Sequence, residues 1–318
     1  MKVLVTGGAG YIGSVLTTKL LKEGYKVDVL DSLVFGGQSL LPHIYNPDFK
    51  LIYGSIISID RKFIEKYDAI LHLAAVGFTQ GGYMEEQINN INYECTKILV
   101  DLCKKYNKRL LFSSTCSNYG ETIEIATEES KLNPTNAYAR SKARAEEYIL
   151  KNYPSAVILR LSTVFGLSPR MRFDTLVNEF VLNAVMSNYI RVYNYNAWRP
   201  YIHIDDVANA FLFFLENEEK GVYNVGDNAL NYTKRDICKI IRKFVPNLNV
   251  ELVGEIDEAR NYRVSFDKIN DIGFKTKRTV EEGIAEIKKA LDNHVFPDPY
   301  SYVYRNIEVY KKYYSKIL

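Results

Sequence analysis

The chain has 318 residues, of which 47% are hydrophobic, and a formal net charge of +3. This hydrophobic content excludes extensive disorder, and at about 150 residues per domain the length predicts two domains. The nearly balanced charge argues against a protein that coats nucleic acid or an anionic membrane.

The sequence predicts a cytoplasmic globular protein. Its longest wholly apolar runs, such as 210–215, hold about six residues, whereas a membrane span needs about 20. Met1 and Lys2 lead directly into a strand-like run, so we expect no signal peptide. The four cysteines lack a Cys-x-x-Cys pair and metal-ligand spacing, which indicates free thiols in a reducing compartment and predicts no metal site.

The first 166 residues alternate short apolar runs with longer segments of helical period. Runs rich in Val, Ile and Leu predict strands at 2–6, 26–31, 50–53, 69–73, 109–114 and 156–161. Apolar residues three and four positions apart predict helices over 12–22, 86–105 and 137–151. Strands that are apolar on both faces, with helices between them, predict an α/β domain with a doubly wound parallel sheet.

The pattern becomes less regular after residue 166. We expect helices over about 173–187, 233–244 and 279–292, a strand and a helix over 201–216, and a tyrosine-rich tail that packs as a helix on a second domain. The predicted division is a first domain over 1–166, to which residues 200–222 return, and a smaller α/β substrate domain over 167–318.

A glycine-rich turn joins the first strand to the first helix. Its glycines include Gly7, Gly10 and Gly13. They permit a tight turn and close approach of a pyrophosphate, while the helix N-terminus attracts phosphates. Glycines are also common in ordinary turns, so the placement between a strand and a helix carries the prediction of a dinucleotide site.

Asp31 ends the second predicted strand, 18 residues after Gly13. A carboxylate at this place accepts hydrogen bonds from the hydroxyls of the adenosine ribose and repels a 2′-phosphate. No Arg follows to neutralise such a phosphate, so NAD is favoured over NADP. The alternative is that Asp31 only begins a turn.

Tyr138 and Lys142 lie one helical turn apart on the same face. We expect the ammonium to lower the pKa of the phenol, so that Tyr138 acts as a general base. The spacing proves little in a chain with 25 tyrosines, and Tyr93 and Lys97 repeat it. Only the first pair follows a strand that ends in hydroxyl side chains, the last of which is Thr115.

These motifs occur in a fixed order along nearly the whole chain: GGAGYIG at 7–13, Asp31, HLAA at 72–75, SST at 113–115, YG at 119–120, Tyr138 with Lys142, and RPYIH at 199–203. The set resembles the extended short-chain dehydrogenase/reductase family, specifically its nucleotide-sugar epimerases and dehydratases. The resemblance implies a Rossmann-type NAD-binding domain, a nucleotide-sugar substrate, and a homodimer formed through the helices over 86–105 and 137–151.

The resemblance also implies individual roles. Tyr138 takes a proton from a sugar hydroxyl, usually at carbon 4, as hydride passes to NAD, while Lys142 holds the nicotinamide ribose and Thr115 positions the hydroxyl. The implied cofactor contacts are Gly7, Gly10, Tyr11, Ile12, Gly13, Asp31, Leu73, Ala74, Ala75, Asn92, Ser113, Tyr138 and Lys142. The implied substrate contacts are Thr115, Thr163, Arg170, Arg172, Arg199 and Arg260.

Plainer alternatives stay open for several of these residues. Asn92 matches a family residue that supports the loops near the cofactor. Arg199 and Arg260 match positions that grip the substrate diphosphate, which suits a planar guanidinium, but they also fit surface arginines of a mildly basic chain. Arg170 and Arg172 fit a nucleotide contact and solvated loop charges equally.

Departures from the family pattern narrow the reaction. Dehydratases of the family usually carry Asp-Glu after the active-site Thr, whereas this chain has Cys116 and Ser117, which disfavours 4,6-dehydration. Cys116 is itself a candidate acid or base for epimerisation, against the alternative of a buried filler. The segment 54–58 lacks the Asp that usually contacts adenine, and Thr163 stands where many relatives have Asn.

We therefore predict an NAD-dependent oxidoreductase that oxidises carbon 4 of an NDP-hexose or NDP-heptose. The alternative is an NDP-sugar 4-epimerase with tightly bound NAD, and a 4,6-dehydratase or 4-ketoreductase is less favoured. Segments 167–174, 198–201 and 259–266 are similar to enzymes that modify sugar nucleotides for bacterial surface polysaccharides, among them a GDP-heptose 4-dehydrogenase. An NAD-binding sensor or scaffold is disfavoured because Tyr138 and Lys142 are both present, and nucleic-acid binding by the tail is disfavoured by the net charge.

Overall fold

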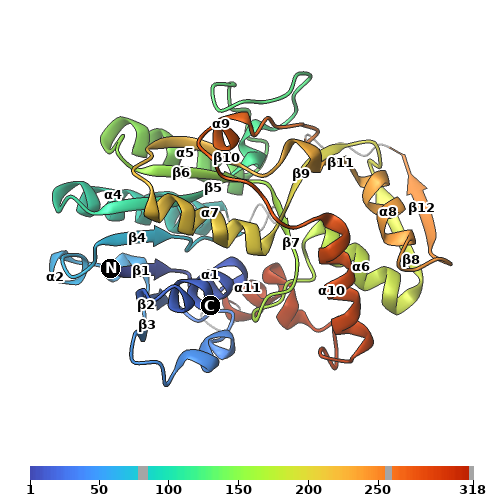
Figure 1. Ribbon diagram of the computed structural model, residues 1–318, viewed down its shortest axis with the longest axis horizontal. Helices are drawn as coiled ribbons and strands as arrows, with labels where there is room; N and C mark the ends of the chain where they lie inside the picture. The colour runs from blue at the N-terminus through green and yellow to red at the C-terminus, as the bar shows by residue number, and fades with distance from the viewer. Residues whose placement is uncertain (78–84, 255–259, 315–318) are drawn as a thin grey trace.

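The computed structural model describes residues 1–77, 85–254 and 260–314, so that residue 259 of the segment 259–266 lies outside the described residues. Seven parallel strands form the main sheet in the order β3-β2-β1-β4-β5-β6-β10 (Figure 1). Their bounds are β1 Lys2–Thr6, β2 Lys26–Asp31, β3 Phe49–Tyr53, β4 Ala69–His72, β5 Arg109–Thr115, β6 Val157–Leu161 and β10 Gly221–Val225. The predicted doubly wound, Rossmann-type parallel sheet is confirmed.

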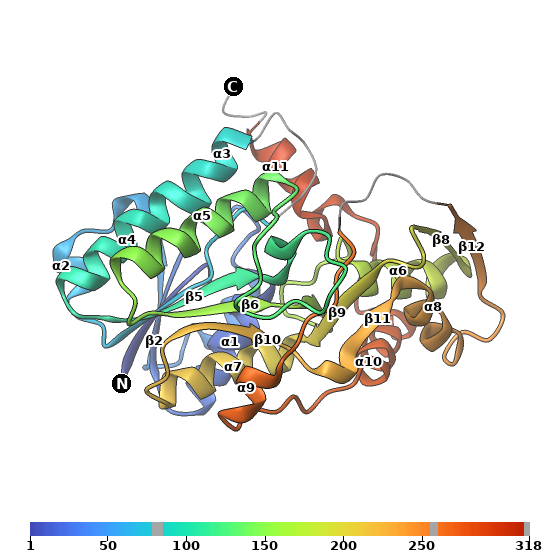
Figure 2. The same ribbon diagram turned by 90° about the horizontal axis from the view of Figure 1, so that it is seen from above.

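Helices cover both faces of this sheet. Figure 2 shows α4 (Cys95–Lys105) and α5 (Ala137–Asn152) on one face, and α1 (Tyr11–Lys22) and α7 (Ile204–Glu216) on the other. Strand β1 shows why: Val3 and Val5 enter the core on one face and Leu4 the core on the other, all fully buried. Each such side chain contributes about 1.5–3 kcal/mol on burial.

The helix predicted over 86–105 is divided into three parts. α3 (Glu85–Asn89) runs into a π-helical turn, Asn90–Glu94, before α4 begins. Single π-helical turns within helices are frequent at functional sites. This one carries Asn92, whose side chain is fully buried.

Two smaller sheets and further helices complete the described structure. β9 (Trp198–His203) pairs with β7 (Thr163–Phe165) and β11 (Asn231–Thr233), and β8 (Tyr189–Tyr193) pairs with β12 (Asn249–Val253). The helices are α2 Arg61–Ile64, α6 Leu176–Ser187, α8 Lys234–Arg242, α9 Asp267–Asp271, α10 Val280–Asp292 and α11 Asn306–Tyr314. Within the segment 200–222, β9 joins the small sheet, whereas α7 packs on α1 and leads to β10 at the edge of the main sheet.

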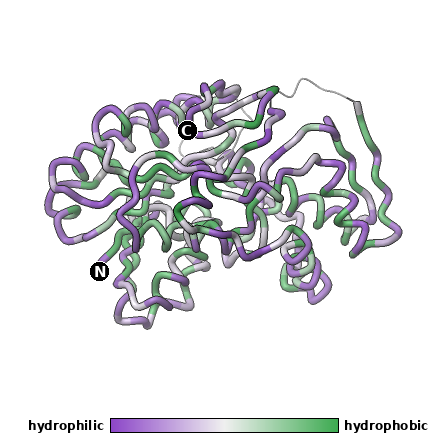
Figure 3. The backbone as a smooth tube through the Cα atoms, turned by 45° about the horizontal axis from the view of Figure 1, so that its top comes forward, coloured by the Kyte–Doolittle hydropathy of each residue, from purple (hydrophilic) through white to green (hydrophobic). Residues whose placement is uncertain are grey.

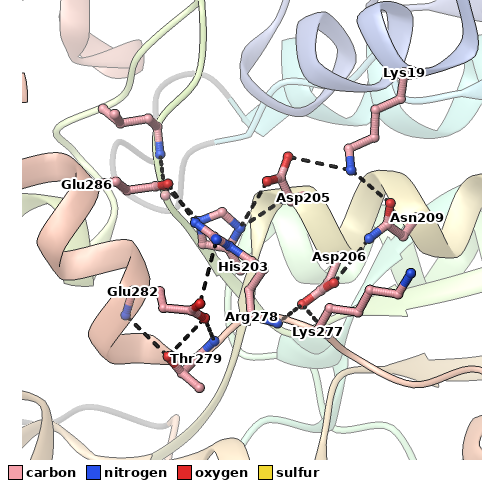
Figure 4. A network of polar contacts seen from close by, with 12 residues as sticks. Lys19, His203, Asp205, Asp206, Asn209, Lys277, Arg278, Thr279, Glu282 and Glu286 are labelled. Atoms are coloured by element: carbon pink, nitrogen blue, oxygen red, sulfur yellow. Dashed lines mark hydrogen bonds and ion pairs between the residues drawn. The ribbon is translucent and has the colours of Figure 1, made fainter. Parts of the chain in front are cut away.

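A polar network fixes α10 to the start of α7 (Figure 4). His203 Nδ1 accepts from the Asp205 N–H at 3.2 Å, which leaves the proton on Nε2 to donate to Glu286 Oε1 at 2.7 Å. Arg278 donates to the other Glu286 oxygen at 2.9 Å, and its own N–H donates to Asp206 at 2.9 Å. Segments distant in the sequence are thus held against the helix that follows β9.

The tyrosine-rich tail does not pack as predicted. Tyr310 on α11 joins a small apolar cluster with Val76 and Ile88, beside Phe35 from the loop after β2. The tail helix therefore packs on the half of the molecule that contains the main sheet, and the prediction that it packs on the second domain is wrong for α11. Helical periodicity identifies an apolar face but not the surface that covers it.

Helices alternate hydrophilic and hydrophobic stretches along the backbone, as amphipathic helices do (Figure 3). Within the described ranges, no helix combines the length and the apolar character that crossing a membrane requires. The same ranges contain no cluster of three or more His, Cys, Asp or Glu side chains able to hold a metal ion.

Candidate active site

The glycines of the first turn are required by close backbone contacts. Gly7 has φ +74°, and a Cβ atom there would lie 2.7 Å from the Ala74 nitrogen. A Cβ on Gly13 would lie 2.2 Å from the Gly7 oxygen. The turn therefore packs the backbones of β1, α1 and the residues after β4 closely together. A pyrophosphate site needs this close approach of the backbone.

A cavity of about 400 Å³ opens at the carboxyl ends of β1, β2 and β4. Six of the predicted cofactor residues line it: Gly7, Gly10, Asp31, Leu73, Ala74 and Ala75. Among its described lining residues there is no Lys or Arg to neutralise a 2′-phosphate. The cavity thus fits the adenosine and phosphate portions of NAD rather than NADP.

Asp31 both begins a turn and faces this cavity. Its carboxylate accepts from the Leu33 N–H at 2.8 Å and from the Ala9 N–H at 3.0 Å. Burial raises the pKa of Asp31, and these two hydrogen bonds lower it. The two interpretations of Asp31 are therefore compatible, because the turn holds the carboxylate at the cavity wall.

The Tyr11 side chain serves the fold instead of the cofactor. Its hydroxyl donates to the Gly166 oxygen at 2.7 Å and accepts from Asn178 at 3.0 Å. Burial raises the pKa of this phenol. The contact joins α1 to the segment after β7, which restricts the predicted cofactor contact of Tyr11 to its main chain.

Asn92 ties the loop after β4 to helix α5. Its side chain accepts from the Val76 N–H at 2.7 Å and donates to the Val76 oxygen at 3.1 Å and to Ser141 Oγ at 3.0 Å. Ser141 in turn donates to the Tyr138 oxygen at 2.8 Å. Asn92 therefore links the loop that follows the cavity residue Ala75 to the turn that carries Tyr138.

Tyr138 lies in the first turn of α5, which Asn136 caps by accepting from the Ala139 N–H at 2.9 Å. Thr115, the last residue of β5, hydrogen-bonds the Tyr138 side chain. Parallel strands place their carboxyl ends at one edge of a sheet, so this pair lies at the same edge as the cavity. The structure thus brings together Thr115 and Tyr138 as the sequence predicts.

Lys142 is a buried side chain that is anchored to strand β5. Its ammonium donates to the Ser113 oxygen at 2.7 Å and lies 4.5 Å from the centre of the Phe112 ring. Burial lowers the pKa of Lys142 to about 7. Burial also raises the pKa of Tyr138, while the charge of Arg172 and the hydrogen bond to Thr115 lower it. The predicted effect of Lys142 on the pKa of Tyr138 stays a prediction, and the structure adds Arg172 and Thr115 as groups that lower this pKa.

Arg172 and Arg170 are not solvated loop charges, because both side chains have partners within the protein. These partners differ between the two residues. Arg172 pairs with Asp174 at 2.8 Å and donates to the Gly77 oxygen at 3.3 Å, close enough for its charge to act on Tyr138. Arg170 is buried against the Phe35 ring at 4.4 Å. It also donates to two backbone oxygens, and burial lowers its pKa to about 10.

The other predicted substrate residues lie around the small sheet. Arg199 is buried, donates to the Trp198 oxygen at 2.9 Å and lies 5.3 Å from the Tyr262 ring, so it is not a surface arginine. Arg260 is half-buried, and Thr163 is half-buried at the start of β7. Their contacts with substrate stay predictions.

Cys116 points away from the site. Its thiol is fully buried and donates to the Arg160 oxygen at 3.2 Å, and burial raises its pKa. A buried neutral thiol that faces the core cannot exchange protons with a substrate, so Cys116 is a filler of the core. Ser117 instead shares a 2.8 Å hydrogen bond with Thr115.

Sequence reasoning missed the buried ion pair that supports this end of β5. Glu146 Oε2 lies 2.8 Å from Arg160 Nη2, and the Glu146 carboxylate also accepts from Ser114 and Asn118. The signal was present in the sequence. Arg160 interrupts a strand that is otherwise apolar on both faces, and an arginine there needs a buried partner.

Together, the fold and the cavity define a Rossmann-type enzyme that binds NAD. Residues 3–226 match the NAD dependent epimerase/dehydratase family. The chain therefore belongs to this family, whose members include nucleotide-sugar epimerases, dehydratases and decarboxylases. The resemblance inferred from the motifs is confirmed, as is NAD as the cofactor.

Curated relatives from Arabidopsis thaliana illustrate the range of the family. A trifunctional UDP-glucose 4,6-dehydratase/UDP-4-keto-6-deoxy-D-glucose 3,5-epimerase/UDP-4-keto-L-rhamnose-reductase is 32% identical over 317 aligned positions, covering 91% of this chain and 46% of that protein. A putative UDP-arabinose 4-epimerase is 31% identical over 279 positions, covering 74% of this chain and 64% of that protein. The chain thus spans about half to two thirds of the length of these relatives.

Solved structures of similar fold carry nucleotide sugars. A UDP-N-acetylglucosamine 4-epimerase from Methanobrevibacter ruminantium M1, in complex with UDP-N-acetylmuramic acid, is 25% identical with a TM-score of 0.83 over 92% of this chain and 98% of that chain. A UDP-glucuronic acid 4-epimerase from Bacillus cereus, in complex with UDP-glucuronic acid and NAD, is 23% identical with a TM-score of 0.83 over 92% of this chain and 99% of that chain. At this identity the second likeness shows the fold alone.

Proposed function

We propose that the protein oxidises carbon 4 of a nucleotide sugar, an NDP-hexose or NDP-heptose, with Tyr138 as the general base. The observation that carries the proposal is the hydrogen bond between Thr115 and Tyr138 at the sheet edge that also forms the NAD cavity. When bound, NAD supplies the acceptor for the hydrogen that leaves carbon 4 with its electron pair.

The protein's own residues prepare and receive the proton. Thr115 orients the Tyr138 hydroxyl, and the positive charge of Arg172 favours the phenolate that must accept the proton of the sugar hydroxyl. Lys142 is anchored by the Ser113 oxygen beneath this site. We assign it the predicted contact with the nicotinamide ribose.

The residues after Thr115 argue against dehydration as the outcome. Elimination of water needs a paired acid and base, whereas Cys116 is buried toward Arg160 and Ser117 is an alcohol that hydrogen-bonds Thr115. Release of the 4-keto sugar is therefore our first proposal. A 4-epimerase with retained NAD is the second, which the 31% identical putative UDP-arabinose 4-epimerase favours.

A product analysis separates these outcomes. The purified protein is incubated with a panel of UDP-, GDP- and dTDP-sugars in the presence of NAD, and products are read by mass spectrometry and NMR. A product lighter by two hydrogens, formed together with NADH, supports the dehydrogenase. An isomer of unchanged mass, inverted at carbon 4, supports the epimerase, and loss of water overturns both.

The same assay tests the role of Tyr138. We expect Tyr138→Phe to lower kcat by about 10²-fold or more while leaving the Kd for NAD within about twofold, because removal of a general base slows the chemical step. Tyr93→Phe is the matched control, since Tyr93 and Lys97 repeat the spacing while Tyr93 packs against an apolar core and does not line the cavity. Full activity of Tyr138→Phe would overturn the assignment.

A further inference from the structure

The C-terminal segment crosses from the smaller sheets to the NAD-binding half of the molecule. The Phe173 N–H donates to the Tyr304 oxygen at 3.0 Å, and the Asn306 N–H donates to Asp174 at 2.7 Å. Arg305 forms an ion pair with Glu179 at 3.2 Å. These contacts fix the start of α11, which then lies beside α3 (Figure 2).

Tyr310 on α11 reaches the NAD cavity from outside residues 3–226, which match the family. Its side chain is 6% exposed and is among the residues that line the cavity. Its ring meets the Phe35 ring edge to face, with centroids 5.2 Å apart and an interplanar angle of 76°. Phe35 follows β2 and Asp31, so this aromatic pair lies at the end of the cavity where Asp31 is placed for the adenosine ribose.

Phe35 is itself held in place from behind. The Arg170 guanidinium lies 4.4 Å from the centre of its ring and donates to the Val303 oxygen at 3.2 Å. One buried cation thus joins the loop after β2 to the segment that leads into α11. This arrangement explains why Arg170 is buried in the protein instead of facing a substrate.

Apolar side chains from the segment after β3 also line the cavity. Ile56 and Ile57 line it from the segment 54–58, which contains no carboxylate. A purine ring bound here therefore meets the apolar side chains of Ile56 and Ile57 and no carboxylate from this segment. Aromatic side chains are suited to this contact because their faces and edges pack on any base.

We propose that Tyr310 and Phe35 form an aromatic wall for the adenine ring of NAD, so that the C-terminal helix α11 is a part of the cofactor site. Tyr310 contributes through its ring, and its hydroxyl is not needed for this contact. The proposal concerns cofactor binding and holds whether or not the protein oxidises carbon 4 of a sugar.

Binding of the two halves of the cofactor tests the proposal. Apoprotein is titrated by calorimetry with NAD, with ADP-ribose, which contains the adenine, and with nicotinamide mononucleotide, which lacks it. We expect Tyr310→Ala to raise the Kd for NAD and for ADP-ribose by about tenfold, in the range typical of a lost base–aromatic contact. The Kd for nicotinamide mononucleotide should stay within about twofold of that of the parent protein. Tyr310→Phe should bind all three ligands within about twofold of the parent protein.

Two further variants separate binding from folding. Tyr310→Leu retains an apolar side chain for the packing of α11, so we expect the ligand-free variant to have a melting temperature near that of the parent protein. Its Kd for ADP-ribose should nevertheless rise as in Tyr310→Ala. Tyr300→Ala changes an exposed tyrosine of the same segment and should change none of the affinities. The proposal is overturned if Tyr310→Leu binds ADP-ribose with the affinity of the parent protein, or if the substitution weakens the binding of ADP-ribose and of nicotinamide mononucleotide equally.

Discussion

Loss of the Glu146 carboxylate should destabilise the fold beneath the catalytic strand. The Glu146 and Arg160 side chains are 1% and 4% exposed, and the carboxylate accepts two hydrogen bonds from the guanidinium, at 2.8 and 3.0 Å. It also accepts from Ser114 and from Asn118, at 2.8 Å, on either side of Thr115. Glu146→Ala thus removes the carboxylate that balances the buried guanidinium and that accepts from two polar side chains, while Arg160 keeps its hydrogen bonds to Tyr119 and to the Glu128 oxygen.

The expected cost follows from this burial. Removing one partner of a buried ion pair costs about 3–5 kcal/mol, because the remaining charge is left without compensation. We expect Glu146→Ala to lower the free energy of unfolding by this amount in urea titrations. Glu65→Ala is the matched control: the Arg61–Glu65 pair has the same 2.8 Å distance but is largely exposed, so its loss should leave stability nearly unchanged.

A double variant separates the uncompensated charge from lost packing. In Glu146→Leu combined with Arg160→Met, both charges are removed, and we expect the protein to recover more than half of the stability lost in Glu146→Ala. The reasoning is refuted if Glu146→Ala unfolds like the parent protein, or if the double variant is no more stable than the single one.

Three further predictions concern the cofactor, the base and assembly. Asp31→Ala should raise the Kd for NAD by about tenfold or more in calorimetry and reduce the preference for NAD over NADP, because hydrogen bonds to a carboxylate are worth about 1.5–3 kcal/mol. An unchanged ratio of the Kd values for NAD and NADP would contradict this. Arg172→Gln removes a positive charge that lowers the pKa of Tyr138, so the rise of kcat with pH should move to higher pH, and a shift to lower pH would contradict it. We expect a homodimer through α4 and α5, on which the apolar side chains of Ile98 and Leu150 are 44% and 43% exposed. The double variant Ile98→Glu, Leu150→Glu should therefore be monomeric in light scattering, whereas a monomeric parent protein would contradict the expectation.

The sequence alone determined the main sheet and the placement of its turns. Strands that bury both faces are rich in apolar residues, and six of the seven strands of this sheet were therefore predicted from the sequence, although Asp28 and Arg160 interrupt two of these runs. The seventh, β10, follows an irregular segment and pairs with β6, which no local pattern indicates. The order of glycine turn, Asp31, Thr115 and Tyr138 placed the site because parallel strands end at one edge.

The tertiary structure alone decided how charges and distant segments act on that site. A pKa depends on burial and on neighbours that are remote in the sequence, so the spacing of Tyr138 and Lys142 gave no sign that the charge of Arg172 also lowers the pKa of Tyr138. Likewise, Arg170 and Tyr310 lie about 140 residues apart, yet both contact Phe35 beside the cavity. Local sequence fixes the period of a helix, whereas only packing decides which surface it covers.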